Sequence, residues 1–160
     1  MAVSRSVQEF LRGSEIAYTV FPHEAAFTAR EEAAAAEVPE RNWAKVVTAF
    51  ADGEPIQAVV PANCHVDFDR LAKVVGVPHV RLATEDELDW LYPDCEPGSM
   101  PPLGPLYHQL VFVDERLTED EEVVFNAGSF RDAVAMRFVY FVRLTKPVIG
   151  RFARPKGDRL

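Results

Sequence analysis

The chain has 160 residues, of which 48% are hydrophobic, so it is long enough for one domain with a sizeable apolar core. Its formal net charge of −8 argues against indiscriminate nucleic-acid binding, which depends on many contacts between basic side chains and phosphates. No segment approaches the roughly 20 consecutive apolar residues of a membrane span, and the first residues lack the apolar run of a signal peptide. We therefore expect a cytoplasmic protein with no membrane partner.

Charge is unevenly distributed along the chain. From residue 143 onward, six basic residues against one acidic residue give a net charge of +5, whereas the preceding residues carry −13. We interpret residues 146–160 as a basic C-terminal tail, and we favour a solvated segment over one that contacts an anionic partner. The two cysteines, Cys64 and Cys95, do not form a disulfide framework and have no second cysteine at metal-ligand spacing.

The first forty residues predict two helices and a strand. Residues 4–12 place apolar side chains at helical intervals behind a serine cap, and residues 16–21 have the composition of a short strand. Thr28 and Glu31 have the spacing of a capping box, so a second helix should begin there and end before Pro39.

The middle of the chain predicts a hairpin followed by two capped helices. The β-branched runs 43–50 and 55–60 flank an Asp-Gly pair that favours a hairpin turn. Residues 66–75 predict a helix that ends at a glycine, residues 79–82 a strand, and residues 84–91 a helix with its own capping box.

The last third predicts strands and a closing helix. We expect residues 110–113 and 122–125 to pair as strands, residues 126–129 to form a turn, residues 133–137 a strand and residues 139–145 a helix. Strands and short helices without regular βαβ alternation indicate the α+β class, with a mixed sheet surrounded by helices in a single domain.

The segment GSMPPLG, residues 98–104, is the most unusual in the chain. Glycine permits backbone angles closed to other residues and lets another molecule approach closely, while proline fixes φ and removes an N–H donor. Two prolines between Gly98 and Gly104 therefore predict a stiff loop with accessible amides.

Searches for familiar catalytic motifs exclude several mechanisms. The four histidines are scattered, with no HExxH motif and no pair at helix spacing, so we expect no metal site. There is no Gly-x-Ser-x-Gly elbow, no phosphate-binding loop and no dinucleotide fingerprint, so we expect neither a serine nucleophile nor a cofactor.

Lys45 lies inside an otherwise apolar predicted strand, WAKVVTAF. A lysine on an edge strand that reaches water with its end group is one interpretation. The alternative is a lysine that points into a cleft, where its charge holds a phosphate or stabilises a developing oxyanion.

Five motifs in order resemble the YbaK/ProX domains, a family of bacterial aminoacyl-tRNA deacylases that includes the editing domain of bacterial prolyl-tRNA synthetases. The resemblance covers about residues 20–150, which we take as the core of one domain spanning residues 1–160. The motifs are His23 with Thr28-Ala-Arg-Glu-Glu-Ala, Ala44-Lys45-Val-Val, Val59-Val-Pro with Val66-Asp-Phe, the loop Gly98 to Gly104, and Asn126-Ala-Gly-Ser. The resemblance implies a mostly antiparallel, partly barrel-like sheet.

The resemblance also implies a function and a set of site residues. The expected reaction is hydrolysis, in trans, of the ester that joins a wrong, small amino acid to a tRNA 3′ end. Lys45 would hold the terminal adenosine or its phosphate, or polarise the carbonyl, while backbone N–H groups of Gly98, Ser99 and Met100 form an oxyanion hole for attack by water. The substrate-binding residues would be His23, Phe27, Thr28, Pro101, Pro102, Leu103, Gly104, Asn126, Ala127, Gly128 and Ser129.

Two alternatives stay open beside a deacylase. One is a non-catalytic module of the same fold that binds an aminoacyl group, a nucleotide or a synthetase; the other is a general hydrolase of small esters. The acidic body would repel tRNA, so recognition would be confined to the 3′ end, use the basic tail, or depend on delivery by an aminoacyl-tRNA synthetase. We expect a monomer or a weak dimer.

Overall fold

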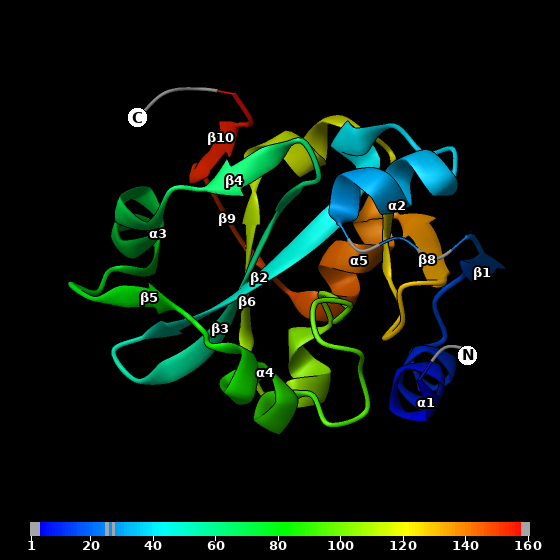
Figure 1. Ribbon diagram of the computed structural model, residues 1–160, viewed down its shortest axis with the longest axis horizontal. Helices are drawn as coiled ribbons and strands as arrows, with labels where there is room; N and C mark the ends of the chain where they lie inside the picture. Colours follow the sequence, from blue (N-terminus) through cyan, green and yellow to red (C-terminus); the bar gives the residue numbers. More distant parts are fainter. Residues whose placement is uncertain (1–3, 25, 27, 158–160) are drawn as a thin grey trace.

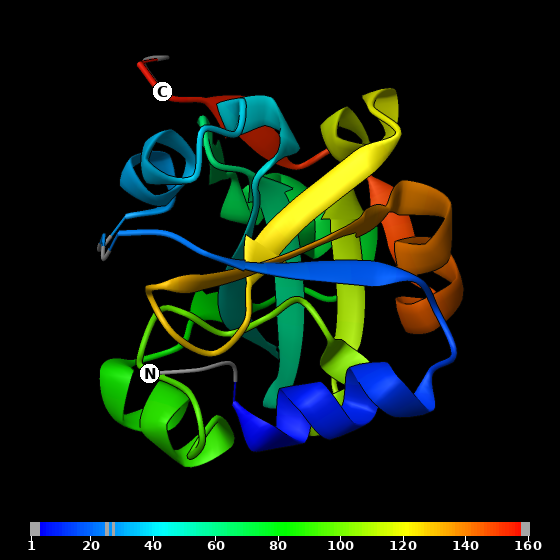
Figure 2. The same cartoon turned by 90° about the vertical axis from the view of Figure 1, so that its right-hand side faces the viewer.

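Two β-sheets that cross each other form the centre of the computed structural model, which describes residues 4–24, 26 and 28–157 (Figure 1, Figure 2). The larger sheet has five strands in the order β5-β2-β3-β6-β9, and the smaller has three in the order β1-β8-β7. Figure 2 shows the smaller sheet lying across one face of the larger. The strands of these sheets are β1 (Tyr18–Pro22), β2 (Ala44–Ala51), β3 (Glu54–Pro61), β5 (Val80–Leu82), β6 (Leu110–Asp114), β7 (Glu122–Asn126), β8 (Asp132–Arg137) and β9 (Val148–Gly150).

Most strand pairs are antiparallel, as predicted. The β2–β3 hairpin turns at Asp52 and Gly53, which both have positive φ, of 47° and 86°. Positive φ at both central residues is the requirement of a type I′ hairpin turn, and Asp-Gly meets it. β6 is the exception to the antiparallel pattern, because it runs parallel to both β3 and β9.

Five short helices of the described chain surround the sheets, and their caps follow the sequence closely. Ser4, Thr28 and Thr84 each accept a hydrogen bond from a backbone N–H three residues later, and at Thr84 the full capping box with Glu87 is present. The third helix begins later than predicted because Asp67 is its cap. The helices are α1 (Arg5–Gly13), α2 (Ala29–Ala35), α3 (Phe68–Val75), α4 (Glu85–Leu91) and α5 (Phe138–Thr145), and the short 3₁₀ turns are η1 (Glu40–Asn42), η2 (Gly104–Tyr107) and η3 (Glu115–Glu119).

Three apolar clusters among the described residues hold the domain together. The largest lies between the two sheets, with Val59 and Val113 of the larger sheet packed near Phe125 and Val134 of the smaller. The second covers the other face of the larger sheet beneath α3, and the third joins α2 to Trp43. None of the helices among the described residues is long and apolar enough to cross a membrane.

The predicted pairing of residues 110–113 with residues 122–125 is wrong. β6 belongs to the larger sheet, whereas β7 pairs with β8 in the smaller one. Val111, Phe112 and Val113 are all buried, as in a parallel strand covered on both faces. Such a continuous apolar run identifies a central strand but does not identify its neighbours.

Residues 146–157 do not form the solvated tail that their charge suggested, and residues 158–160 of that predicted tail lie outside the described residues. Residues 146–157 contain β9 and a second short strand, β10 (Ala153–Pro155), which pairs with β4 (Cys64–Val66). Phe152 is fully buried, and the backbone N–H groups of Phe152 and Ala153 donate to the buried carboxylate of Asp114 at 2.8 and 2.7 Å. The packed core therefore extends beyond residues 20–150, at this end and through Val7 of α1.

Candidate active site

A pocket of about 240 Å³ opens where α2, the start of β2, the 98–104 loop and the end of β7 meet. These segments are far apart in the sequence, and four of the expected site residues, from four separate motifs, line the pocket together. The lining residues are Thr28, Ala29, Glu32, Trp43, Lys45, Val46, Gly98, Asn126 and Lys156.

Lys45 brings a positive charge to the pocket from β2. Its side chain is partly buried, and Nζ donates to the backbone carbonyl of Cys64 in β4 at 2.7 Å. Burial, together with the nearby charge of Lys156, lowers the pKa of Lys45 to about 8. At neutral pH the ammonium is still mostly charged, with two of its three N–H donors beyond the one that Cys64 uses.

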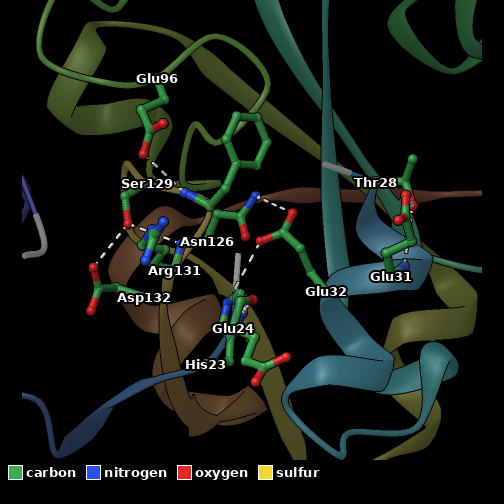
Figure 3. A network of polar contacts seen from close by, with 11 residues as sticks. His23, Glu24, Thr28, Glu31, Glu32, Glu96, Asn126, Ser129, Arg131 and Asp132 are labelled. Carbon is green, nitrogen blue, oxygen red and sulfur yellow. Dashed lines mark hydrogen bonds and ion pairs between the residues drawn. The ribbon is translucent and has the colours of Figure 1, made fainter. Parts of the chain in front are cut away.

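Glu32 brings a carboxyl group from α2 to the same pocket. The residue is only 1% exposed, and this burial raises its pKa to about 8. The side-chain amide of Asn126 donates to Oε1 of Glu32 at 3.1 Å, and Oε2 lies 3.7 Å from Nε2 of His23. Figure 3 shows the carboxyl group between these two side chains.

Several buried polar atoms at this place have no hydrogen-bond partner among the residues that the structure describes. They are Nε2 of His23, Oε2 of Glu32, Nε1 of Trp43 and Oδ1 of Asn126. A buried polar atom left unpaired costs about 1–3 kcal/mol, so buried polar atoms normally have a partner in the protein, in water or in a ligand. Three of these residues line the pocket, where water or a polar ligand can complete the hydrogen bonding.

Gly98 presents its backbone to the pocket. Its φ is +93°, and a Cβ atom here would lie 3.3 Å from the ring of Phe130. The N–H of Gly98 donates to the sulfur of Met100 at 3.2 Å, whereas that of Ser99 donates to the carbonyl of Glu96 at 2.9 Å. A thioether is a weak acceptor, so the Gly98 amide can be transferred to a ligand more easily than the Ser99 amide.

The rest of the loop is buried behind the pocket and does not line it. The carbonyl of Pro101 accepts from the side-chain amide of Gln57 at 3.1 Å, and a side chain at Gly104 would overlap the carbonyl oxygen of Gln109. Glycine at that position therefore permits close packing of the loop on itself. The expected site residues in this buried set are Ser99, Met100, Pro101, Pro102, Leu103 and Gly104.

Of the 126–129 turn, only Asn126 lines the pocket. Ala127 is fully buried, and the N–H of Gly128 donates to the carbonyl of Ser99 at 3.1 Å, which ties the turn to the glycine-proline loop. The Ser129 hydroxyl donates to Asp132 at 2.8 Å and so fixes the start of β8 (Figure 3).

His23 contacts the site without lining the pocket. Its ring is 1% exposed and packs edge-on to Trp43, with ring centroids 5.8 Å apart. Nδ1 lies 2.8 Å from the carbonyl oxygen of Glu24; since a carbonyl can only accept, Nδ1 carries a proton. Phe27, also expected at the site, lies outside the described residues.

Five lining residues were missed by the sequence analysis: Ala29, Glu32, Trp43, Val46 and Lys156. A signal for Glu32 was present, because Ala29, Ala33 and Ala36 pack on the core at helical spacing and Glu32 falls in the same stripe. A carboxylate in the apolar stripe of a helix is rare without a partner or a function. Lys156 carried no such signal, because the return of the C-terminus to this pocket depends on the pairing of β10 with β4.

Comparison with known proteins identifies the family of the chain. Residues 23–144 match the model of the aminoacyl-tRNA editing domain, which confirms the resemblance noted in the sequence. A curated relative, the multifunctional Ser/Thr-tRNA deacylase ProXp-y of Escherichia coli K12, is 28% identical over 101 residues. That match covers 62% of this chain and 59% of the relative, so it spans about three fifths of the relative's length.

Two solved structures share the fold. A putative trans-editing enzyme for prolyl-tRNA synthetase superposes with a TM-score of 0.83 at 22% identity, over 96% of this chain and 99% of that one. The hypothetical protein APE2540 gives the same TM-score at 21% identity, over 94% of this chain and all of that one. At these identities the likeness establishes the α+β fold.

Proposed function

The chain belongs to the family of aminoacyl-tRNA editing domains, and from this premise we propose that it hydrolyses the ester between a small amino acid and the 3′ end of a tRNA. One observation carries the proposal. Lys45, Gly98 and Asn126 come from three motifs separated by tens of residues, and they line one pocket that also contains unpaired buried polar atoms. The name of the Escherichia coli relative, a Ser/Thr-tRNA deacylase, supports the same activity.

Two lysines favour binding of the tRNA 3′ end. Lys45 and Lys156 both line the pocket, and ammonium groups attract the phosphate of a terminal nucleotide. Residues 1–142 carry a net charge of −13, which disfavours extended contact with the body of the tRNA. The proposed contact is therefore local, with the terminal nucleotide at the lysines and the amino acid inside the pocket; an aminoacyl-tRNA synthetase that delivers the tRNA would supply the remaining affinity.

The chemistry proposed is direct attack by water. Water adds to the ester carbonyl carbon, and the carbonyl oxygen becomes an oxyanion. The bond between that carbon and the ribose oxygen then breaks, and a proton from the attacking water goes to the ribose oxygen, so that the free amino acid and the tRNA hydroxyl are formed. The Gly98 amide would exchange its weak contact with the Met100 sulfur for the oxyanion. Lys45 would add a positive charge, either on the nearby phosphate or on the carbonyl oxygen.

The size of the pocket favours small amino acids. A volume of about 240 Å³ equals that of about eight water molecules in the liquid. Trp43 is fully buried and rigid at the wall, and Val46 narrows the space further. Alanyl, seryl and threonyl side chains fit such a volume, and we expect Trp43 and Val46 to disfavour aromatic ones.

A panel of mischarged tRNAs tests the proposal. The loss of each aminoacyl ester is followed over time with and without protein, for alanyl, seryl, threonyl, valyl and phenylalanyl tRNAs. Hydrolysis of the small esters above the spontaneous rate is the expected result. Binding without turnover across the panel would instead identify a non-catalytic module, and equal hydrolysis of a chromogenic ester without tRNA would identify a general esterase.

A further inference from the structure

Of the three unpaired atoms that belong to residues lining the pocket, two are side-chain oxygens and one, Nε1 of Trp43, is an N–H donor. Oε2 of Glu32 and Oδ1 of Asn126 accept hydrogen bonds, and both are buried without a partner among the described residues. The Asn126 amide already donates its N–H to Oε1 of Glu32, which leaves its oxygen as the free end. Nε2 of His23 lies 3.7 Å from Oε2 of Glu32, behind these two oxygens.

A group that carries several N–H donors complements the unpaired oxygens of Glu32 and Asn126. An ammonium donates three hydrogen bonds and accepts none, whereas a hydroxyl brings one donor and a carboxylate brings none. In a polar pocket enclosed by protein, hydrogen bonds to a charged group contribute more than neutral ones. The two lysines that line the same pocket, Lys45 and Lys156, are N–H donors with a positive charge, so they are suited to an anionic group of the ligand.

We propose that Glu32 and Asn126, with His23 behind them, bind the primary α-ammonium group of the aminoacyl ester and thereby select aminoacyl over other acyl groups. This inference rests on the proposed function, since it concerns the orientation of the same substrate. The ammonium would be held by Glu32 and Asn126, while the ribose and phosphate lie toward Lys45 and Lys156. The carbonyl carbon is one bond from the carbon that bears the ammonium, so this contact also places it near the Gly98 amide.

Proton balance is compatible with this contact. Burial raises the pKa of Glu32 to about 8, which is close to the value of about 7.7–8.0 typical of α-amino groups. When a neutral amine enters beside the neutral Glu32 carboxylic acid, the carboxylic acid carries one proton that it can give to the amine nitrogen. Transfer of that proton from Glu32 to nitrogen gives a carboxylate and an ammonium without any change in the net charge of the pocket.

Paired substrates that differ only at this group test the inference. Alanyl-tRNA treated with nitrous acid becomes lactyl-tRNA, in which a hydroxyl replaces the ammonium and the ester is retained. For the wild-type protein, kcat/KM should be about 10- to 100-fold higher for alanyl-tRNA, the range expected for hydrogen bonds to a charged group. Equal rates on the two esters would overturn the inference while leaving the deacylase function intact.

Glu32→Gln should remove this preference, because the neutral amide keeps the shape of the side chain but cannot form the ion pair. We expect kcat/KM on alanyl-tRNA to fall while that on lactyl-tRNA stays within about twofold, so that the ratio approaches one. Glu37→Gln is the matched control, because it makes the same substitution at an exposed position just beyond α2. It should leave the ratio of kcat/KM on alanyl-tRNA to that on lactyl-tRNA unchanged. An equal loss on both esters by Glu32→Gln would show a role in the chemical step or in folding and would overturn the inference.

Binding measurements separate this inference from the proposed reaction. The probes are 3′-alanylamido-adenosine and 3′-lactylamido-adenosine, which contain an amide in place of the ester, and their Kd values are compared by calorimetry. Tighter binding of the alanyl compound to the wild-type protein, lost in Glu32→Gln, supports ammonium recognition even if no ester is hydrolysed. Equal Kd values for the two compounds overturn it even if esters are hydrolysed.

Discussion

The carboxyl group of Glu32 and the ammonium group of Lys45 line the same pocket, and burial brings both of their pKa values to about 8 from opposite directions. Below pH 8 Glu32 is mostly neutral and Lys45 mostly charged, so the pair contributes about one positive charge. Above pH 8 the carboxylate forms and the ammonium loses its proton, so the pair contributes about one negative charge. The pocket is therefore suited to an anionic ligand group at neutral pH and loses that property in alkali.

Lys45→Ala should retain the fold but lose about 10- to 100-fold in kcat/KM on a mischarged tRNA, as expected for one hydrogen-bonded charge. Its pKa is lowered, so the wild-type contribution is complete below pH 8 and falls as pH rises through about 8. Lys45→Arg, which stays protonated, should reduce this alkaline fall to the part caused by ionisation of Glu32, with rates corrected for spontaneous ester hydrolysis.

A melting curve provides the control for Lys45. Removing a partly buried ammonium removes a desolvation cost, so Lys45→Ala should melt within a few degrees of the wild-type protein at pH 7. A large drop in Tm would show that the hydrogen bond from Nζ to the Cys64 carbonyl holds β4 in place, and the loss of activity would then be structural.

Local features of this fold could be predicted from the sequence, whereas distant pairings could not. The Asp52-Gly53 turn and the Thr84 capping box depend on residues within four positions of each other, and both are present as expected. The sheet partners of β6 and the return of Lys156 to the pocket depend on contacts across tens of residues. No hydrophobic pattern within either segment specifies such a partner.

For the candidate site, too, the motifs could be predicted from the sequence, whereas contacts made only in the folded chain could not. Lys45, Gly98 and Asn126 belong to motifs that can be read along the chain, and they meet at one pocket. The role of Met100 could not be read in that way, because only the folded loop shows its sulfur beneath the Gly98 amide, where it is 4% exposed. An oxyanion hole built from Gly98 stays a prediction.

Glu32→Gln should change the dependence of stability on pH. The folded pKa is raised above the unfolded value of 4.5 to about 8, so the folded state binds more protons and the free energy of unfolding falls as pH rises through this interval. The amide of the variant has no such titration. Relative to wild type, the variant should gain stability between pH 5 and pH 8, on the order of a few kcal/mol. Urea denaturation at several pH values measures this gain, and a difference that is independent of pH would contradict a buried neutral Glu32.

Replacement of either cysteine should leave the activity within about twofold of wild type. Burial raises the pKa of Cys95 to about 12, and it also raises the pKa of the Cys64 thiol, so neither is a thiolate at neutral pH. Cys95→Ser and Cys64→Ala are assayed on the same tRNA together with their Tm values. More than a tenfold loss in a variant that melts normally would reopen covalent catalysis by that thiol.

Lys156→Ala should weaken the binding of a tRNA 3′ end and reduce its dependence on salt. Loss of one phosphate contact lowers the slope of log K against log salt concentration by about 0.7 for a single strand. Lys73→Ala, which removes an exposed charge from α3 outside the pocket, is the control and should keep the wild-type slope. Identical slopes in both variants would mean that the C-terminal lysine does not contact the nucleic acid.

The range of amino acids should be set by Val46 on the wall of the pocket. Val46→Ala should raise kcat/KM for valyl and phenylalanyl tRNA relative to alanyl tRNA, by about 10-fold or more, since each methylene of fit is worth about 1–3 kcal/mol. Val46→Phe should restrict hydrolysis to the smallest esters. Val47→Ala, in which the change faces the cluster beneath α3, is the matched control and should keep the wild-type ranking. Met100→Ala, by contrast, should reduce stability, because the Met100 side chain is buried. If Met100→Ala changed the ranking and the Val46 variants did not, the wall that selects the substrate would be the glycine-proline loop.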